Sequence, residues 1–212
     1  MIGIIDYGMG NLFSVAKALE RLGADYFISG DPNELWKADG LILPGVGAFQ
    51  DGMKALQEQG LVELIKSEAD VEKPILGICL GMQLLFQESE ENGLTEGLGL
   101  LQGRVVKFAG ITEAGRRYKV PHMGWNHLSF QQPNSPLLKG IDPDFVYFVH
   151  SYYVVTEDAA ILIASARYED VVVPAVVGRG RLFGTQFHPE KSSGMGMAIL
   201  KGFVELVKGA DT

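Results

Sequence analysis

The sequence has a single cysteine, no long apolar run and fewer basic than acidic residues. One thiol among 212 residues cannot form an intrachain disulfide. The longest apolar stretches, residues 159–166 and 171–177, are far too short to cross a bilayer, and residues 1–6 lack the basic lead-in of a targeting segment. Lys and Arg number 18 against 26 Asp and Glu, and the net charge of −8 repels phosphate backbones and anionic membranes. We therefore expect a cytoplasmic protein that binds neither nucleic acid nor membrane.

The composition is that of an ordinary globular protein, with 47% hydrophobic and 21% charged residues. A chain of this length buries roughly 70% of its unfolded surface on folding, so it needs no disulfide or structural metal to supplement its core. No internal repeat, low-complexity tract or long linker divides the sequence. We expect a single domain spanning residues 1–212.

Short apolar runs alternate with segments of helical periodicity in the first half of the chain, and β-rich segments follow from residue 102. The predicted strands are residues 2–6, 26–29, 41–43, 75–78, 105–108, 117–120, 145–155, 161–167, 171–177 and 182–187. The predicted helices are 12–22, a short one near 31–34, 53–59, 61–68, 80–88 and a last one capped by Ser192 or Ser193. The pattern predicts an α/β fold with a mixed, largely parallel central sheet flanked by helices and a β-rich C-terminal half.

The cysteine lies where a predicted buried strand turns into a helix, in the run Gly77-Ile78-Cys79-Leu80-Gly81. This is the setting of a nucleophile elbow, in which residues two positions either side of the nucleophile must be small because the turn brings strand and helix together. Free N–H groups and the macrodipole at the helix N-terminus favour a thiolate. An inert buried thiol is the alternative, and the paired glycines favour the nucleophile.

A thiolate that attacks a carboxamide needs an imidazole to exchange protons and a carboxylate to orient that imidazole. His188 and Glu190 close a predicted strand and are two residues apart, so their side chains project from the same face in extended backbone. Pro189 between them is tolerated at the end of a strand, where α/β proteins place their sites. Taken alone, the triplet also fits an ordinary turn with a solvated acid.

Two glycines follow the third predicted strand, in the run Pro44-Gly45-Val46-Gly47. Glycine lets the backbone approach a ligand closely, so this loop can present N–H groups to a developing oxyanion. The N–H of Leu80, directly after the cysteine, is the natural second donor. A glycine turn without a ligand is the alternative.

Other site types find little support in the sequence. A dinucleotide loop would require glycine at position 13, which is Phe13, and no phosphate-binding Walker motif is present. His122, His127 and His150 lack the spacing of a zinc site, so we interpret them as structural or interface histidines. We expect no metal and no organic cofactor.

The motifs together resemble the triad (class I) glutamine amidotransferase family. The resemblance rests on GICLGMQ at 77–83, HPE at 188–190 and PGVG at 44–47. Within that family the chain is similar to the glutaminase subunits of imidazole glycerol phosphate synthases, through DYGMGNL at 6–12, PGVGAF at 44–49, VPHMGWN at 120–126 and FVHSY at 148–152. The resemblance covers essentially the whole chain.

The resemblance implies a role for each matched residue. Cys79 is expected to be the nucleophile that forms a glutamyl thioester, His188 the acid and base, and Glu190 the group that orients His188. The implied oxyanion donors are the amides of Gly47 and Leu80. The implied contacts to L-glutamine are Gly45, Gln83, Glu91, Ser151 and Tyr152.

The resemblance also implies a (β/α)₈ cyclase subunit as the partner, which would receive the ammonia. The residues that match positions at or near that interface are Pro121, Met123, Trp125, Asn126 and Tyr147. Aromatic residues and methionine often anchor such contacts, although core packing is the alternative for them. Because the glycines of residues 44–47 allow an amide to point either way, we expect low activity until the partner docks.

Three other functions stay open on the sequence alone. The chain could be another triad glutaminase subunit, such as those of anthranilate or pyridoxal phosphate synthesis. It could be a stand-alone cysteine hydrolase or peptidase on the same elbow. It could also be a non-catalytic binding subunit.

Overall fold

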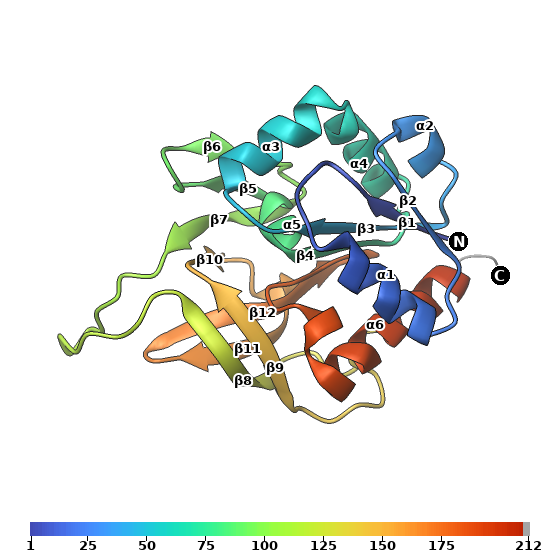
Figure 1. Ribbon diagram of the computed structural model, residues 1–212. Helices are drawn as coiled ribbons and strands as arrows, with labels where there is room; N and C mark the ends of the chain where they lie inside the picture. The colour runs from blue at the N-terminus through green and yellow to red at the C-terminus, as the bar shows by residue number, and fades with distance from the viewer. Residues whose placement is uncertain (210–212) are drawn as a thin grey trace.

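The computed structural model describes residues 1–209, and a nine-stranded mixed sheet runs through the centre of this part of the chain (Figure 1). In spatial order the strands are β2 (Tyr26–Ser29), β1 (Ile2–Ile5), β3 (Gly40–Gly45), β4 (Ile75–Cys79), β13 (Leu182–Thr185), β12 (Val171–Arg179), β11 (Leu162–Tyr168), β8 (His122–Phe130) and β9 (Phe145–His150). The strands from β2 to β13 run parallel, and those from β13 to β9 pair antiparallel. The predicted α/β architecture is confirmed.

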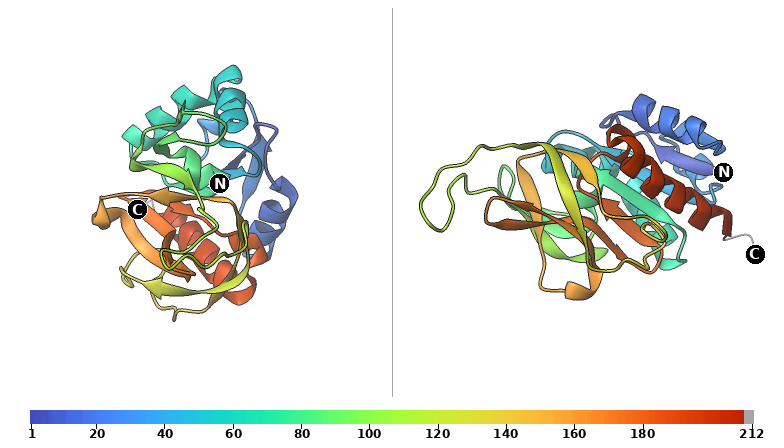
Figure 2. Two further views of the ribbon diagram at one scale, coloured as in Figure 1. Left: turned by 90° about the vertical axis from the view of Figure 1, so that its left-hand side faces the viewer. Right: turned by 90° about the horizontal axis from the view of Figure 1, so that it is seen from below.

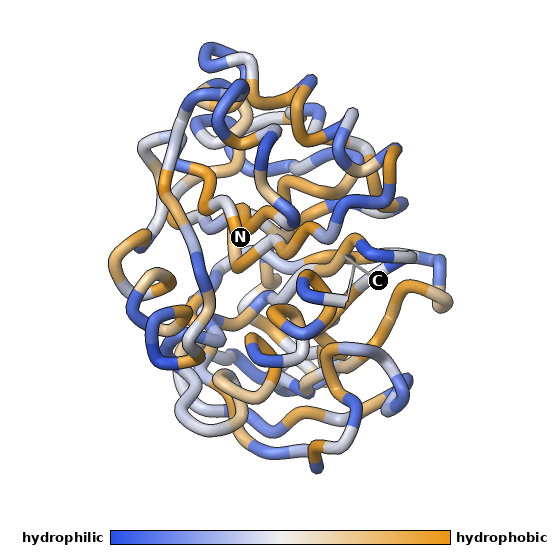
Figure 3. The backbone as a smooth tube through the Cα atoms, turned by 90° about the vertical axis from the view of Figure 1, so that its right-hand side faces the viewer, coloured by the Kyte–Doolittle hydropathy of each residue, from blue (hydrophilic) through white to orange (hydrophobic). Residues whose placement is uncertain are grey.

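Helices cover both faces of the parallel half of the sheet. α1 (Leu12–Arg21) and α6 (Ser193–Lys208) lie on one face, and α2 (Pro32–Leu35), α3 (Phe49–Glu58), α4 (Leu61–Asp70) and α5 (Leu80–Leu84) lie on the other (Figure 1). Successive strand residues alternate between the two cores: Ile4 packs with α1 and α6, whereas Ile5 packs with the opposite layer. Figure 3 shows the result, with hydrophobic segments through the centre and hydrophilic ones mostly towards the outside.

A second sheet of four strands, among the same described residues, forms from segments that the sequence analysis assigned differently. Its order is β10 (Tyr152–Val155), β7 (Leu101–Lys107), β5 (Phe86–Ser89) and β6 (Thr95–Glu96). The helix predicted over 80–88 ends at Leu84, because Phe86 pairs with Leu101 in a parallel ladder instead of continuing the helix. The strand predicted over 145–155 breaks at Ser151, and its two parts join different sheets.

One further local prediction was wrong, and one strand was not predicted at all. Residues 117–120 form no strand, and only an isolated bridge joins Arg117 to Ile111 in a long loop that extends away from the body (Figure 2). Strand β8, which follows this loop, was not predicted, because its polarity runs against its burial: His122 is buried, whereas Met123 and Trp125 are exposed. Within residues 1–209, no helix combines the length and the apolar character that spanning a bilayer requires.

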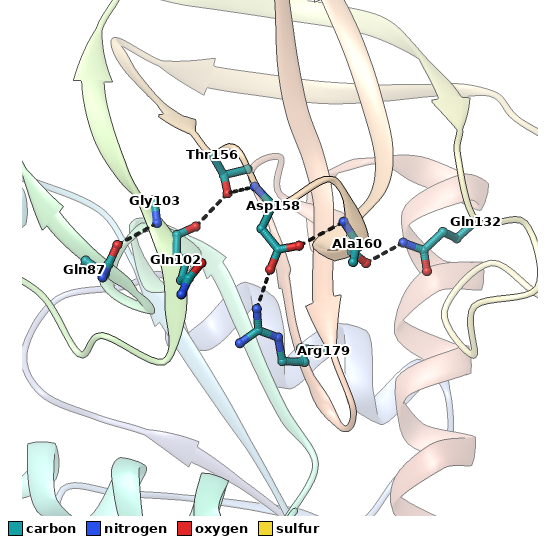
Figure 4. A network of polar contacts seen from close by, with 8 residues as sticks. All are labelled: Gln87, Gln102, Gly103, Gln132, Thr156, Asp158, Ala160 and Arg179. Atoms are coloured by element: carbon teal, nitrogen blue, oxygen red, sulfur yellow. Dashed lines mark hydrogen bonds and ion pairs between the residues drawn. The ribbon is translucent and has the colours of Figure 1, made fainter.

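The small sheet is tied to the large one by a network of polar contacts centred on Asp158 (Figure 4). Asp158 accepts a hydrogen bond from the N–H of Ala160, which caps the short helix η1 (Ala159–Ile161), and pairs with Arg179 at the end of β12. The hydroxyl of Thr156 donates to the carbonyl of Gln102 in β7. The network joins the turn after β10 to strands of both sheets.

Candidate active site

The ends of three neighbouring parallel strands bring the predicted site together. In the sheet β4 lies between β3 and β13, with Gly45 paired to Cys79 and Thr185 paired to Ile78. Because the carboxyl ends of parallel strands meet at one edge of a sheet, the loop after β3, the cysteine after β4 and the histidine after β13 converge there.

Cys79 occupies a strained turn. Its backbone angles are φ 55° and ψ −110°, in a region that residues other than glycine rarely adopt, and α5 begins at the next residue. A Cβ at Gly77 would lie 2.6 Å from the carbonyl oxygen of Gly81, and a Cβ at Gly81 would overlap the carbonyl oxygen of Leu43. The two glycines therefore allow the elbow to close, as the spacing in the sequence required.

His188 and Glu190 form a buried pair beside the cysteine. Nδ1 of His188 lies 2.8 Å from Oε1 of Glu190, and the side chain of Glu190 is only 1% exposed. Burial opposes a charge on His188, yet hydrogen bonds with Cys79 and then Glu190 outweigh burial and raise its pKa to about 9. The imidazole thus interacts with the thiol on one side and the carboxylate on the other, which is the order of a proton-transfer triad.

Ser192 supports this pair but does not cap the last helix with its side chain. It holds the N-cap position of α6, where its hydroxyl makes no capping hydrogen bond. The hydroxyl instead donates to the carbonyl of His188 and accepts from the N–H of Tyr147 in β9. Ser192 therefore helps to hold the backbone of His188 in place, where the prediction had it capping the helix.

A cavity of about 360 Å³ opens over the cysteine and the histidine. Most of the residues predicted to bind substrate line it; they are Gly47, Leu80, Gln83, Glu91, Ser151 and Tyr152. Pro121 lines it as well, from the start of the segment predicted to meet a partner. The cavity is large enough for an amino acid and has the nucleophile on its wall.

Gly45 lies behind this cavity and not on its wall. A Cβ at Gly45 would lie 2.5 Å from the hydroxyl oxygen of Tyr7 and 2.9 Å from the N–H nitrogen of Gly81. The structure therefore gives Gly45 a packing reason to be glycine. Glu91 lines the cavity but also accepts a hydrogen bond of 2.8 Å from the N–H of Phe49, at the start of α3.

The backbone at Leu80 and Gly47 bears on their expected role as oxyanion donors. Leu80 is the first residue of α5, so its N–H lies outside the hydrogen bonds of that helix. Gly47 has φ 117°, a conformation that favours glycine. In the part of the chain that the structure describes, no three His, Cys, Asp or Glu side chains cluster closely enough to hold a metal ion.

Comparison with known proteins identifies the family. A model of the family described as glutamine amidotransferase class-I matches residues 3–206. The chain belongs to the class-I glutamine amidotransferase family. Among curated relatives, the imidazole glycerol phosphate synthase subunit HisH of Geobacillus kaustophilus (strain HTA426) is 64% identical over 209 residues, which covers 99% of this chain and 98% of the relative. The HisH subunit of Bacillus subtilis (strain 168) is 56% identical, with 97% and 96% covered.

Solved structures agree with this amidotransferase on the fold. A crystal structure of a glutamine amidotransferase superposes with a TM-score of 0.75 at 20% identity and covers 98% of each chain. The structure of PurLQS from Thermotoga maritima gives 0.76 at 21% identity, with 97% of each chain covered. At these identities the likeness concerns the fold alone, and it confirms the architecture predicted from the sequence.

The site of this amidotransferase contains two residues that the sequence analysis missed. Gln186 is fully buried, and its amide Nε2 lies 3.9 Å from Sγ of Cys79. It precedes His188 by two residues, and that spacing in extended backbone was the available signal. His150, interpreted from the sequence as a structural or interface histidine, lines the cavity and contacts His122, with 2.9 Å between their ring nitrogens.

Of the predicted interface residues, Pro121 lines the cavity just before β8; Met123, Trp125 and Asn126 lie on β8, and Tyr147 lies on β9. Met123 is 61% and Trp125 53% exposed, so neither belongs to the core. The rings of Trp125 and Tyr147 lie 5.9 Å apart, and the carbonyl of Tyr147 accepts from the N–H of His188. The side chain of Asn126 is held within the fold, since it donates to the carbonyl of Arg167 at 2.8 Å.

Proposed function

We propose that this chain is the glutaminase subunit of imidazole glycerol phosphate synthase and acts in histidine biosynthesis as a cytoplasmic enzyme. It hydrolyses L-glutamine to glutamate and ammonia, and the ammonia passes to a (β/α)₈ cyclase partner. Relatives that carry the HisH subunit name at 56–64% identity over nearly the full chain support this assignment. The observation that carries it is the arrangement of Cys79, His188 and Glu190 around one cavity.

The geometry supports a two-step hydrolysis. Sγ of Cys79 attacks the side-chain amide carbon of glutamine, and the oxyanion that forms accepts hydrogen bonds from the N–H groups of Leu80 and Gly47. His188 protonates the leaving nitrogen, the C–N bond breaks, and ammonia departs from a glutamyl thioester. His188 then takes a proton from water, whose oxygen attacks the thioester and releases glutamate and the thiol. Glu190 holds the imidazole in position throughout.

The rest of the cavity is proposed to hold the amino-acid part of glutamine. Gln83, Ser151 and Tyr152 contribute to the lining of the cavity, and Glu91 adds a carboxylate for an ammonium group. Gly45 contributes by allowing the oxyanion loop to pack closely on Tyr7. The proposed reaction uses this chain, its substrate and water.

A partner is required because ammonia becomes ammonium in bulk water near neutral pH and loses its lone pair. The relatives are named as subunits, which indicates a multi-subunit complex. The exposed Met123 and Trp125, together with Tyr147, Pro121 and Asn126, form a surface beside the cavity mouth. We propose that the cyclase docks on this surface and receives ammonia there.

The test is to purify the chain with a (β/α)₈ cyclase and to measure glutamate release with and without it. We expect release to rise when the cyclase and its nucleotide ligand are present, and equal rates would contradict activation by the partner. Cys79→Ala should abolish glutamine-driven synthesis and leave the complex active on ammonium salts.

Three further outcomes would each assign the chain a different function. Unchanged glutamine-driven synthesis in Cys79→Ala would indicate a non-catalytic subunit. Association with a synthase of another pathway in place of the cyclase would indicate a different triad glutaminase. Cleavage of peptides without glutamate release from free glutamine would indicate a stand-alone cysteine peptidase.

A further inference from the structure

Two buried histidines that the proposed reaction does not use lie at the first residue of β8 and the last residue of β9, and the second of them lines the cavity. His122 and His150 are 2% and 6% exposed, and Nδ1 of His122 lies 2.9 Å from Nε2 of His150. They come from neighbouring strands, in which the two residues are paired directly. Burying two imidazoles is costly unless their nitrogens are hydrogen-bonded, so the partners of each nitrogen matter.

Backbone groups at both ends determine the direction of these hydrogen bonds. At one end, Nδ1 of His150 lies 2.8 Å from the carbonyl oxygen of Tyr152, which can only accept. At the other end, the amide of Asn126 is oriented by its 2.8 Å bonds to the carbonyl of Arg167 and to the N–H of His127. Its nitrogen therefore faces Nε2 of His122, at 3.4 Å.

The groups at the two ends allow only one placement of the ring protons when both histidines are neutral. His150 carries its proton on Nδ1, so its Nε2 accepts from Nδ1 of His122, and Nε2 of His122 accepts from Asn126. Burial lowers the pKa of His122 to about 4, and burial together with smaller contributions from neighbouring groups lowers that of His150 to about 3. Both rings are neutral at physiological pH, which agrees with the single arrangement.

The same hydrogen bonds continue into the glutamine cavity and reach the nucleophile. The carbonyl of Tyr152 also accepts from Nε2 of Gln83 at 3.0 Å, and that nitrogen lies 3.1 Å from Oε1 of Gln186. Nε2 of Gln186 in turn faces Sγ of Cys79. We call this series the polar chain; its members are Asn126, His122, His150, Tyr152, Gln83, Gln186 and Cys79.

Strand β8 carries the first two members on its inner face and exposed apolar residues on its outer face. His122 and Asn126 face the protein, whereas Met123 and Trp125, between them, face outward. We propose that His122 and His150 are positioning residues of the glutaminase reaction. Through the polar chain they fix the position of the residues that line the glutamine cavity relative to strand β8. This inference rests on the proposed function.

The surroundings of His122 allow a sharp test. Its ring stacks between Phe148 and Tyr168, with centroids at 4.6 and 4.0 Å. His122→Phe keeps an aromatic ring there and removes both hydrogen bonds, whereas His122→Asn restores a donor near Nδ1. His127→Phe is the matched control, because His127 lies on the same strand and its ring makes no hydrogen bond within residues 1–209.

The variants are compared in the complex with the cyclase, by the KM and kcat for glutamine. We expect His122→Phe to raise the KM about tenfold, because an acceptor on His150 loses its donor, with a smaller change in kcat. His122→Asn should recover part of the loss, and His127→Phe should behave as the unmodified chain. Equal KM values for His122→Phe and the unmodified chain, or equal losses in the two Phe variants, would overturn the proposal.

A measurement on the unmodified chain keeps the proposal testable if His122→Phe does not fold. Nitrogen-15 NMR of labelled histidines should find both His122 and His150 neutral with the proton on Nδ1, the less common tautomer. A proton on Nε2 of either ring would overturn the polar chain. Absence of glutamate release by the unmodified complex would instead contradict the proposed function, which this tautomer measurement does not depend on.

Discussion

Individual residues at the elbow determine whether the site can form. Cys79 adopts a strained conformation only because Gly77 and Gly81 let strand and helix approach each other. The turn places the sulfur on the wall of the cavity, where it contacts His188 and Gln186. The sequence showed the glycine spacing, while the contacts of the sulfur follow from the sheet.

Gly81→Ala tests this packing directly. Its methyl group would overlap the carbonyl of Leu43, so we expect the free energy of unfolding to fall by about 3 kcal/mol and glutaminase activity to be lost. Gly194→Ala in α6 is the control, since nothing lies within 4 Å of its Cβ position. Urea unfolding of both variants measures the difference, and an unchanged stability of Gly81→Ala would contradict the close approach.

His188 gives the stability of the protein a dependence on pH. Burial disfavours its charge, but Cys79 and Glu190 raise its pKa from 6.5 to about 9. A raised pKa means that the protonated ring stabilises the fold fully below about pH 6.5, and that this contribution is lost as the pH rises through 9. The difference in unfolding free energy between the unmodified chain and His188→Asn should therefore shrink from pH 6.5 to 9. Urea titrations across this range that showed a constant difference would contradict the shift.

Among the helices and strands, contacts between distant segments decided the cases that local patterns assigned wrongly. Residues 86–88 follow directly on the helical segment that begins at residue 80, but their backbone pairs with β7. Ser151 separates two strands of similar composition that join different sheets. The break at Ser151 matters for the site, because it turns the backbone so that Ser151 and Tyr152 face the cavity.

Replacing Asp158 measures how much the polar network between the two sheets contributes to the stability of the protein. Asp158→Ala removes the cap of η1 and the ion pair with Arg179, of which the cap is the stronger contribution since the ion pair is partly exposed. We expect the free energy of unfolding to fall by about 1 kcal/mol, as measured by urea unfolding. Asp142→Ala is the control, because exposed Asp142 makes no hydrogen bond or ion pair within residues 1–209. Equal effects would show that the network contributes no stability.

For the molecule as a whole, the cavity adjoins the strands that carry the exposed residues, because Pro121 just before β8 and His150 at the end of β9 line it. A protein docked on these strands would cover the mouth of the cavity and could collect ammonia before it meets bulk water. The polar chain then connects that docking surface with the glutamine pocket inside the protein.

Trp125→Ala tests the docking surface. Its ring is 53% exposed and rests on Tyr147, so we expect cyclase binding to weaken at least about 30-fold while the stability of the isolated chain changes little. The second tryptophan, Trp36, is 66% exposed and directly follows α2, a helix that lies away from β8 (Figure 1), and Trp36→Ala serves as the control. Titration calorimetry with the cyclase gives both affinities, and equal affinities would exclude this surface.

The sequence alone was sufficient for the α/β alternation of the first 79 residues, the cysteine elbow and the spacing of His188 and Glu190. These features are local, since they depend on glycine at a tight turn, on helix caps and on the two-residue repeat of extended backbone. Only the tertiary structure decided which strands pair, that Gln186 faces the sulfur, and that His122 and His150 form one hydrogen-bonded pair. Those contacts join residues 28 to 107 positions apart, and their partners are selected by the packing of the whole sheet, which no short stretch of sequence specifies.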